Sequence, residues 1–286
     1  MDKMVVQGGV QLNGVVQVSG AKNAALPILF STLLADGEHV FHNVPKLKDI
    51  DSTLELLSSL GCKWSWNDDD LRINVKRAES MEAHYDIVRK MRASILCLGP
   101  LLTKYGEAIV SMPGGCAIGT RPIDLHLDAM RAMGAEISLE EGYVRAFAKK
   151  LKGTTYVFET STVGGTENLM MAAALADGTT ILENAAKEPE IVDMAEYLIL
   201  MGAKITGHGT GVITIEGVDK LKPAEYSIMP DRIEAGTLLI AGAITGGQVT
   251  VEKMVSHHID SLIGKMKEAG FQFKVQDNSV TVLPTA

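Results

Sequence analysis

The fold is encoded in a stretch that recurs along the chain, Leu175-Ala176-Asp177-Gly178-Thr179-Thr180-Ile181 in its third copy. An apolar segment stops at a glycine, and strand-forming residues follow. We interpret the glycine as the end of a helix, because the left-handed conformation beyond a helix end costs little only for glycine. Equivalent glycines stand at Gly37, Gly106 and Gly247, so the copies lie about 70 residues apart.

A second landmark follows each copy of the first. It is again a glycine between an apolar segment and a short alternating strand, at Gly61, Gly134, Gly202 and Gly270. Two landmarks that stay in step through four copies predict a repeated unit of strand, helix, strand, helix, strand, strand. Because a single unit has one apolar face to bury, several must pack together to close a core. We therefore predict an α/β fold built from βαβαββ units.

Local patterns predict individual elements of these units. Residues 5–18 alternate like a pair of strands, and Asp124 and Asp193 are expected to start helices. The apolar segments 169–176 and 235–244 are too short to span a membrane and are expected to be buried helices. Helical spacing of apolar residues predicts two further buried faces, formed by Leu54, Leu56, Leu57 and Leu60 and by Met194, Tyr197, Leu198 and Met201.

Composition excludes several classes of protein. The 286 residues are 46% hydrophobic, which excludes disorder, and suffice for about two domains. The net charge of −8 argues against a nucleic-acid partner, so an anionic ligand would need a locally basic pocket. Three cysteines are too few for a disulfide framework, and the first residues lack a signal-peptide pattern, so we expect a cytoplasmic protein. No histidine or cysteine cluster has metal-ligand spacing, so no metal is expected.

One loop carries a distinctive cysteine. Residues 112–122 hold three glycines, two prolines, Cys116 and Arg121. The thiol could be reactive, since a nearby arginine favours the thiolate or holds an anion, or it could be an ordinary cysteine in a turn. His126 could tune that thiol or satisfy helix polarity. Cys62 and Cys97 lie in apolar contexts and are interpreted as small core residues.

Three further segments have two interpretations each. Ser19-Gly20-Ala21-Lys22-Asn23 joins a strand to a helix, which suits phosphate binding or leaves a solvated lysine. Arg92 precedes an apolar helix and either binds a ligand or extends into solvent. Thr162 begins a helix either as a plain cap or as part of an anion site, and the carboxylates of residues 188–193 complement a helix dipole.

Taken together, these segments resemble the enolpyruvyl transferase family, and within it the UDP-N-acetylglucosamine 1-carboxyvinyltransferases. The resemblance rests on residues 19–27, 91–94, 113–126, 183–193 and 230–234, and it runs in order through the whole chain. It implies an inside-out α/β barrel fold of two domains with three units each and an active site in the cleft. It also implies transfer of the enolpyruvyl group of phosphoenolpyruvate to the sugar 3-hydroxyl, the first committed step of peptidoglycan synthesis, with no cofactor.

The resemblance also implies roles for individual residues. Cys116 matches the catalytic cysteine that protonates the methylene carbon of phosphoenolpyruvate. The phosphoenolpyruvate contacts match Lys22, Asn23 and Arg121. The UDP-N-acetylglucosamine contacts match Arg92, Arg121, Pro122, Ile123, Asp124, Leu125, Thr160, Ser161, Thr162 and Val163. The chain departs from the family at Thr160, where a lysine is expected, and at Thr162, where a serine is expected.

Length is the second departure, since the chain resembles four of the family's six units. We expect residues 21–229 to form one complete domain and residues 1–20 with 230–286 to form part of another. The part without a counterpart carries the family's aspartate base and further arginines, so we expect the chain alone to be inactive. An incomplete domain would also expose apolar helix faces and favour self-association.

Two alternatives are weighed against this interpretation. The chain could be a non-catalytic relative that binds UDP-sugars or a partner protein. The related shikimate-pathway transferase shares the repeat, but it has no such cysteine loop and binds no UDP-sugar.

Overall fold

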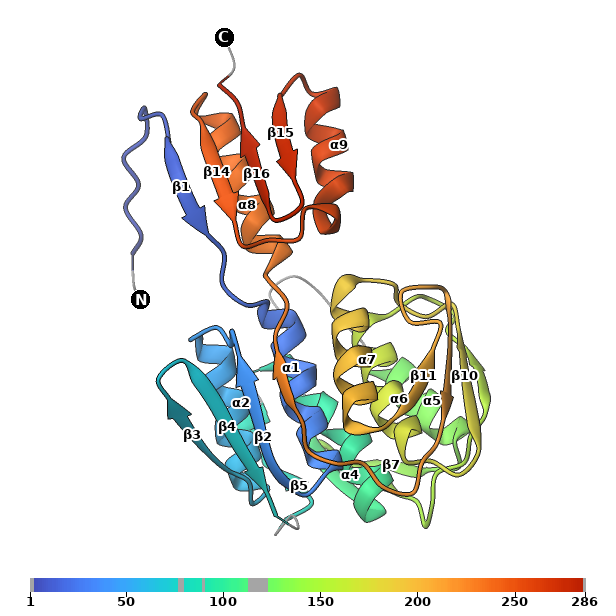
Figure 1. Ribbon diagram of the computed structural model, residues 1–286. Coiled ribbons are helices and arrows are strands. Elements are labelled where there is room, and N and C mark those ends of the chain that lie inside the picture. Colours follow the sequence, from blue (N-terminus) through green and yellow to red (C-terminus); the bar gives the residue numbers. More distant parts are fainter. Residues whose placement is uncertain (1–2, 77–79, 89–90, 113–122, 285–286) are drawn as a thin grey trace. The chain divides into compact units, whose positions relative to one another are not determined.

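The computed structural model describes residues 3–76, 80–88, 91–112 and 123–284, with the backbone alone for Arg92. The chain divides into two compact units (Figure 1). Unit 1 comprises Met1–Ala21 and Met229–Ala286, and unit 2 comprises Lys22–Ile228.

Unit 2 contains three four-stranded sheets of the same design, in which two parallel strands adjoin an antiparallel pair. The first has the order β13 (Glu225–Ser227), β2 (Gly37–His42), β4 (Asp70–Val75), β3 (Lys63–Asn67). The second has the order β5 (Glu82–Ala83), β6 (Glu107–Ser111), β8 (Tyr143–Phe147), β7 (Glu136–Glu140). The third has the order β9 (Thr155–Val157), β10 (Thr179–Glu183), β12 (Val212–Glu216), β11 (Lys204–Thr206). Because β13 comes from the end of unit 2 and pairs with β2, it closes the first sheet.

Each sheet is associated with an inner and an outer helix. The inner helices are α1 (Lys22–Ser31), α4 (Leu98–Tyr105) and α6 (Val163–Ala174), with η1 (Thr32–Leu34) after α1 and η2 (Arg92–Cys97) before α4. The outer helices are α2 (Lys48–Ser59), α5 (Asp124–Ala132) and α7 (Pro189–Met201), and α3 (Tyr85–Val88) is a short turn. The inner helices are buried on nearly every side, and α6 is buried from Gly165 to Ala174. Helices thus form the centre of unit 2, and the sheets lie outside them.

The predicted repeat is confirmed. Each of the four copies of the repeat has the order βαβαββ along the chain. All four glycines of the second landmark have positive φ, between 92° and 108°. In the first landmark the fourth glycine was misplaced by one residue, because α8 (Arg232–Ile244) is followed by Gly246 with φ 67°. Gly247 has a different constraint, since a Cβ there would lie 1.9 Å from the Leu12 carbonyl oxygen.

Most of the predicted helix faces are confirmed as well. Both quartets of apolar residues, one in α2 and its C-cap Leu60 and the other in α7, are fully buried. Asp124 starts α5 as expected, but the expectation for Asp193 was wrong. Helix α7 begins at Pro189, whose ring favours the first position of a helix. Asp193 lies inside the helix and accepts a hydrogen bond from the Tyr226 hydroxyl at 2.8 Å.

Unit 1 contains one further copy of the repeat. Its sheet has the order β1 (Gly14–Gln17), β14 (Val249–Glu252), β16 (Ser279–Val282), β15 (Phe273–Gln276), with helices α8, η3 (Ser256–Ile259) and α9 (Asp260–Glu268). The expected strand pair in residues 5–18 was wrong. Only β1 is a strand there, because it forms its ladder with β14 from the far end of the chain, while residues 3–13 run outside the sheets.

Helix α8 differs from its counterparts in unit 2. The apolar segment 235–244 is a helix as predicted, but its surface is only partly buried, with Ile240 39% and Ile244 73% exposed. The inner helices of unit 2 are covered by other helices as well as by sheets, whereas α8 packs within unit 1 against a single sheet and its neighbouring segments.

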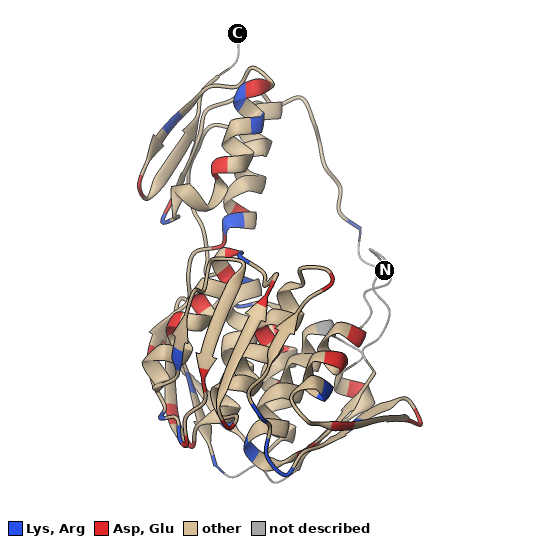
Figure 2. Ribbon diagram, turned by 90° about the vertical axis from the view of Figure 1, so that its right-hand side faces the viewer, with Lys and Arg blue, Asp and Glu red and all other residues tan. Residues whose placement is uncertain are grey.

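The described residues carry their charges in a scattered pattern. Figure 2 shows Lys and Arg interspersed with Asp and Glu along both units. Helices long and apolar enough to cross a membrane are absent from the described part of the chain. Cys62 and Cys97 are buried, which confirms their interpretation as small core residues, and burial raises the pKa of each thiol to about 12.

A buried histidine makes the stability of unit 2 depend on pH. His39 Nε2 donates to the Ala35 carbonyl at 3.2 Å, so Nδ1 accepts from the Tyr197 hydroxyl at 2.5 Å. Burial lowers the pKa of His39 from 6.5 to about 4. The unfolded chain therefore binds this proton first, and stability falls as the pH drops from 6.5 towards 4, by about 3 kcal/mol in total.

Urea unfolding followed by tryptophan fluorescence measures this effect, because Trp64 and Trp66 both lie in unit 2. We expect His39→Gln to flatten the pH dependence between pH 6.5 and 4. The matched control His257→Gln changes an exposed histidine of unit 1 and should leave the dependence as it is. An unchanged slope in His39→Gln would contradict this assignment.

Candidate functional site

The inner helices of unit 2 run parallel to one another. Gly99 N of α4 donates to Asn168 Oδ1 of α6, and four residues further along each helix the Thr103 hydroxyl donates to Ala172 O. Lys104, near the end of α4, donates to Leu33 O beyond the end of α1. Contacts between α4 and α6 thus occur in the same order along both helices, and the ends of α4 and α1 lie together. The three helices therefore run in the same direction and begin at the same end of unit 2.

The outer helices begin at that end too. Lys22 of α1 pairs with Asp49 of α2 at 3.0 Å, and the loop before α7 donates from Ala186 N to the Thr166 hydroxyl at 3.1 Å. His126, near the start of α5, lies beside the first turn of α6. We call this surface the helix-start end of unit 2; it comprises the first turns of α1, α2, η2, α5, α6 and α7.

The first turns differ in charge between inner and outer helices. Each outer helix carries its own carboxylates in the first turn, Asp49 and Asp51 in α2, Asp124 in α5 and Glu190 in α7. The first turns of α1, η2 and α6 carry none. Helix N-termini attract negative charge, and a carboxylate in the first turn partly neutralises that attraction. The centre of the helix-start end therefore keeps an uncompensated preference for an anion.

Lys22 and Asn23 open α1 at this end. The Lys22 side chain is 39% exposed, and its ion pair with Asp49 fixes its direction. Asn23 is exposed. An ammonium group held at a helix N-terminus and open to solvent is a suitable partner for phosphate, so the arrangement agrees with the phosphate interpretation of this segment.

The segment before α6 forms a capped helix start. Thr160 and Ser161 are exposed, and the Thr162 hydroxyl accepts a hydrogen bond from Gly165 N at 3.3 Å. The helix-cap interpretation of Thr162 is thereby confirmed. The amides of Val163 and Gly164 have no partner inside the helix by its geometry, so they remain directed at the helix-start end.

The remaining predicted residues are described only in part. Ile123 is buried, Asp124 is exposed and Leu125 is half-buried at the start of α5. Arg92 opens η2, but its side chain lies outside the described atoms. Cys116, Arg121 and Pro122 lie outside the described residues, so their predicted roles remain predictions.

Two polar residues of α6 were not predicted as buried. Glu167 is the fifth residue of α6 and only 4% exposed. Burial raises the pKa of Glu167 well above its usual range, and Glu190 and Glu188 raise it further. Asn168, the next residue, is fully buried. The signal in the sequence was the polar run 166–168 inside an otherwise apolar helix.

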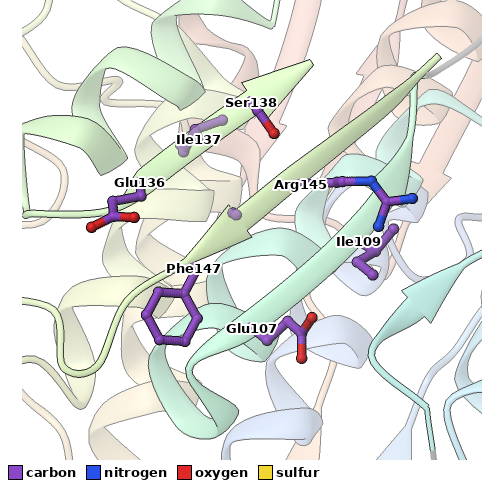
Figure 3. Close-up of a pocket in the computed structure, with 8 residues that line it drawn as sticks. Glu107, Ile109, Glu136, Ile137, Ser138, Arg145 and Phe147 are labelled. Carbon is purple, nitrogen blue, oxygen red and sulfur yellow. The ribbon is translucent and has the colours of Figure 1, made fainter. Parts of the chain in front are cut away.

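A shallow pocket lies elsewhere, over the sheet of β5, β6, β8 and β7 (Figure 3). Phe147 stands between Glu107 and Glu136 on the two neighbouring strands, and Arg145 stands between Ile109 and Ser138. The pocket contains none of the predicted site residues and lies on the exposed side of the sheet. A set of three or more residues able to hold a metal ion is absent from the described part of the chain.

Comparison with known proteins links these segments to one family. The family described as EPSP synthase (3-phosphoshikimate 1-carboxyvinyltransferase) matches residues 6–285. The UDP-N-acetylglucosamine 1-carboxyvinyltransferase of Bdellovibrio bacteriovorus is 69% identical over 98% of this chain and 68% of its own length. The enzyme of the same name from Geotalea daltonii is 55% identical over 99% of this chain and 68% of its own length.

Solved structures show the same fold. The enolpyruvyl transferase NikO from Streptomyces tendae superposes with a TM-score of 0.85 at 20% identity, over 98% of this chain and 67% of that protein. EPSP synthase from Acinetobacter baumannii has a TM-score of 0.75 at 18% identity, over 96% of this chain and 65% of that protein. The predicted α/β fold with repeated units is confirmed by these likenesses.

The buried Glu167 gives the site a pH-dependent stability of its own. Because the folded pKa is raised, the folded chain holds a proton that the unfolded chain releases above pH 4.5, and stability falls as the pH rises. We expect Glu167→Gln, which mimics the protonated acid, to unfold at a higher urea concentration than the wild type at pH 8. The difference should shrink towards pH 4.5.

The exposed Glu159 supplies a control for this measurement. Glu159→Gln changes a solvated carboxylate near the same helix start, so it should follow the wild type at every pH. A Glu167→Gln curve parallel to that of the wild type would show that the buried carboxyl is ionised.

Proposed function

Because the chain belongs to the EPSP synthase family of carboxyvinyltransferases, we propose that it transfers the enolpyruvyl group of phosphoenolpyruvate to the 3-hydroxyl of UDP-N-acetylglucosamine. The observation that carries the choice of acceptor is the 69% identity to a relative named for this reaction over 98% of the chain. In the reaction the sugar 3-hydroxyl gives up its proton and its oxygen bonds to the central carbon of phosphoenolpyruvate, whose methylene carbon gains a proton. The resulting methyl group then loses a proton as phosphate leaves.

Phosphoenolpyruvate would bind at the start of α1. Lys22 and Arg121 would hold its phosphate, and Asn23 would donate to it. The exposed Lys22 ammonium beside an uncompensated helix N-terminus supports this placement. The ion pair with Asp49 holds the ammonium in position and leaves the Lys22 side chain 39% exposed.

UDP-N-acetylglucosamine would bind across the other helix starts. Its contacts would come from Arg92 at η2, from residues 121–125 before and in α5, and from residues 160–163 before α6. The common end of these helices and the absence of carboxylates from the first turns of η2 and α6 support a diphosphate there. Thr160 stands where the resemblance leads us to expect a lysine, so one charge contact to the nucleotide would be absent.

Cys116 would act as the acid of the addition step. Its thiol would protonate the methylene carbon of phosphoenolpyruvate, and a closing loop would exclude water during the transfer. The chain spans 68% of the length of the relatives named above, and we expect turnover to require residues equivalent to their remaining part as well. We place this activity in the cytoplasm, at the start of peptidoglycan synthesis, and hence in cell wall biogenesis, cell shape and cell division.

The exposed face of α8 supports a further proposal, self-association through unit 1. Ile233, Ile240 and Ile244 project exposed apolar surface from a helix whose counterparts in unit 2 are covered. Burying such surface between two copies is favourable at about 25 cal/mol per Å². Analytical ultracentrifugation should show a dimer that Ile240→Asp dissociates, and a monomer at every concentration would contradict it.

Phosphate release from phosphoenolpyruvate and UDP-N-acetylglucosamine tests the proposed reaction. We would measure it with the chain alone and with the corresponding remaining segment of the Bdellovibrio relative added. We expect turnover on addition of the segment and its loss in Cys116→Ala. Turnover that survives Cys116→Ala would contradict the role of the thiol. Binding of the UDP-sugar without release of phosphate in both cases would favour a binding-only relative.

Lys22 supplies a second test. Lys22→Ala should weaken phosphoenolpyruvate binding about tenfold or more, because a charge-assisted hydrogen bond to phosphate contributes about 1.5–3 kcal/mol. The control is Lys204→Ala, which removes another exposed lysine that is paired with a carboxylate, Glu216. Isothermal titration calorimetry measures both, and equal affinities in the two variants would exclude Lys22 from the site.

A further inference from the structure

Phe147 is an exposed aromatic residue in the shallow pocket over the sheet of β5, β6, β8 and β7. It is 55% exposed on the outer face of that sheet. Glu107 of β6 and Glu136 of β7 are its register partners on the two neighbouring strands, and both are exposed. Figure 3 shows the ring between the two glutamates. We call these three residues the Phe147 row.

The spacing of the strands places both carboxylates within reach of one bound group. Neighbouring strands lie about 4.8 Å apart, and side chains directly opposite each other are separated by about 5 Å at their Cβ atoms. A cation on the face of the Phe147 ring therefore meets Glu107 on one side and Glu136 on the other. The ring attracts it through the quadrupole of the π-system, and the carboxylates attract it through their charge.

The arginine in the same pocket does not neutralise the Phe147 row. Arg145, two residues before Phe147 on β8, forms an ion pair with Glu140, with 3.5 Å between Nε and Oε2. Among the residues that the structure describes, neither Glu107 nor Glu136 has an ion pair or a side-chain hydrogen bond. Both carboxylates are therefore available to a group that comes from outside the chain.

The first sheet of unit 2 balances its charges in the equivalent row. Glu38 of β2 is in register with Asn74 of β4, which is in register with Lys63 of β3. Arg72, two residues before Asn74, donates to Glu38 at 2.9 Å. Arg145 has the place of Arg72 in the second sheet, but it pairs with Glu140 and leaves Glu107, the counterpart of Glu38, without a cation.

The third sheet balances the equivalent row as well. Thr179 of β10 is in register with Glu216 of β12, and Glu216 with Lys204 of β11. Lys204 pairs with Glu216 at 3.4 Å. Among the three described sheets of unit 2, the Phe147 row alone has two carboxylates, no cation and an exposed aromatic side chain.

The shape of the pocket favours a side chain carried by a protein. Its volume of about 350 Å³ is at the small end of the range for ligand pockets, and it is open above the sheet. A small molecule would be enclosed on one side only, whereas the surface of a protein partner excludes water from the other side. Arginine suits the row better than lysine, because its planar guanidinium stacks on a ring and donates from several N–H groups at once.

We propose that the Phe147 row is a docking site for an arginine-bearing segment of a partner protein. The guanidinium stacks on the Phe147 ring and donates to Glu107 and Glu136. The partner is basic where it meets this row, since charge complementarity determines which surfaces can approach each other. The proposal does not depend on the proposed function, because the pocket contains none of the residues assigned to the substrates.

A titration of the full chain with short blocked peptides tests the proposal. One peptide has a single arginine among glycines and serines, and the control peptide has citrulline in its place, which keeps the shape of arginine without its charge. We would follow the backbone amide signals by NMR. The signals of Phe147, Glu107 and Glu136 should move with the arginine peptide and stay in place with the citrulline peptide. Added salt should weaken the binding.

Variants of the row assign the binding to its parts. Phe147→Leu keeps an apolar side chain but removes the ring, and it should raise the Kd of the arginine peptide about fivefold. Glu107→Gln combined with Glu136→Gln should also raise it about fivefold, because two exposed ion pairs are lost. The control Glu216→Gln changes a carboxylate in the equivalent row of the third sheet and should leave the Kd unchanged. Urea midpoints close to that of the wild type verify that the variants fold.

Several outcomes would overturn the proposal. Signals of Phe147 and Glu136 that do not move, equal affinities for the two peptides, or an unchanged Kd in Phe147→Leu would each exclude an arginine site. A dimer in sedimentation that Phe147→Asp separates would make this face an interface between copies of the chain instead. The titration is repeated with the remaining segment of the Bdellovibrio relative added. Loss of peptide binding there would mean that this segment occupies the row, which would exclude a separate protein partner.

Discussion

The burial of three parallel helices in its centre is the constraint on which the rest of unit 2 depends. Helices α1, α4 and α6 are apolar on nearly every side, so each is stable only while the neighbouring helices and the surrounding sheets cover it. Because the three run in one direction, the starts of α1 and α6 lie at one end together with η2, which precedes α4. The same packing that closes the core thus gathers these helix starts where an anion can bind.

The polar groups inside this apolar centre link the core to the site. A buried amide without partners is costly, so Asn168 must keep its hydrogen bonds to η2, α4 and α5. The outer helices neutralise their own N-termini with carboxylates, whereas the inner ones do not. The charge preference of the helix-start end is therefore a property of the arrangement of helices, although the net charge of the chain is −8.

Much of the fold could be predicted because its signals are local. The glycine that ends each helix needs a positive φ that other residues adopt rarely, so the repeat is visible in the chain itself. The predictions were wrong where the local structure depends on contacts with segments that are distant in the sequence. Residues 5–18 were expected to pair with each other, but β1 pairs with β14 from the far end of the chain. Asp193 has a cap-forming side chain, but Pro189 starts the helix and Tyr226 binds the carboxylate.

The sequence by itself determined the repeated βαβαββ unit, the helix ends and the family, because these depend on residue type and spacing. It also identified the segments that begin at Lys22, Arg92, Asp124 and Val163 as candidates for a site. Only the tertiary structure decided that these segments meet at one end, that Glu167 is buried with a raised pKa and that Asn168 binds His126. Those facts depend on which helices pack together and in which direction, and contacts between residues 42 positions apart leave no local pattern in a single sequence.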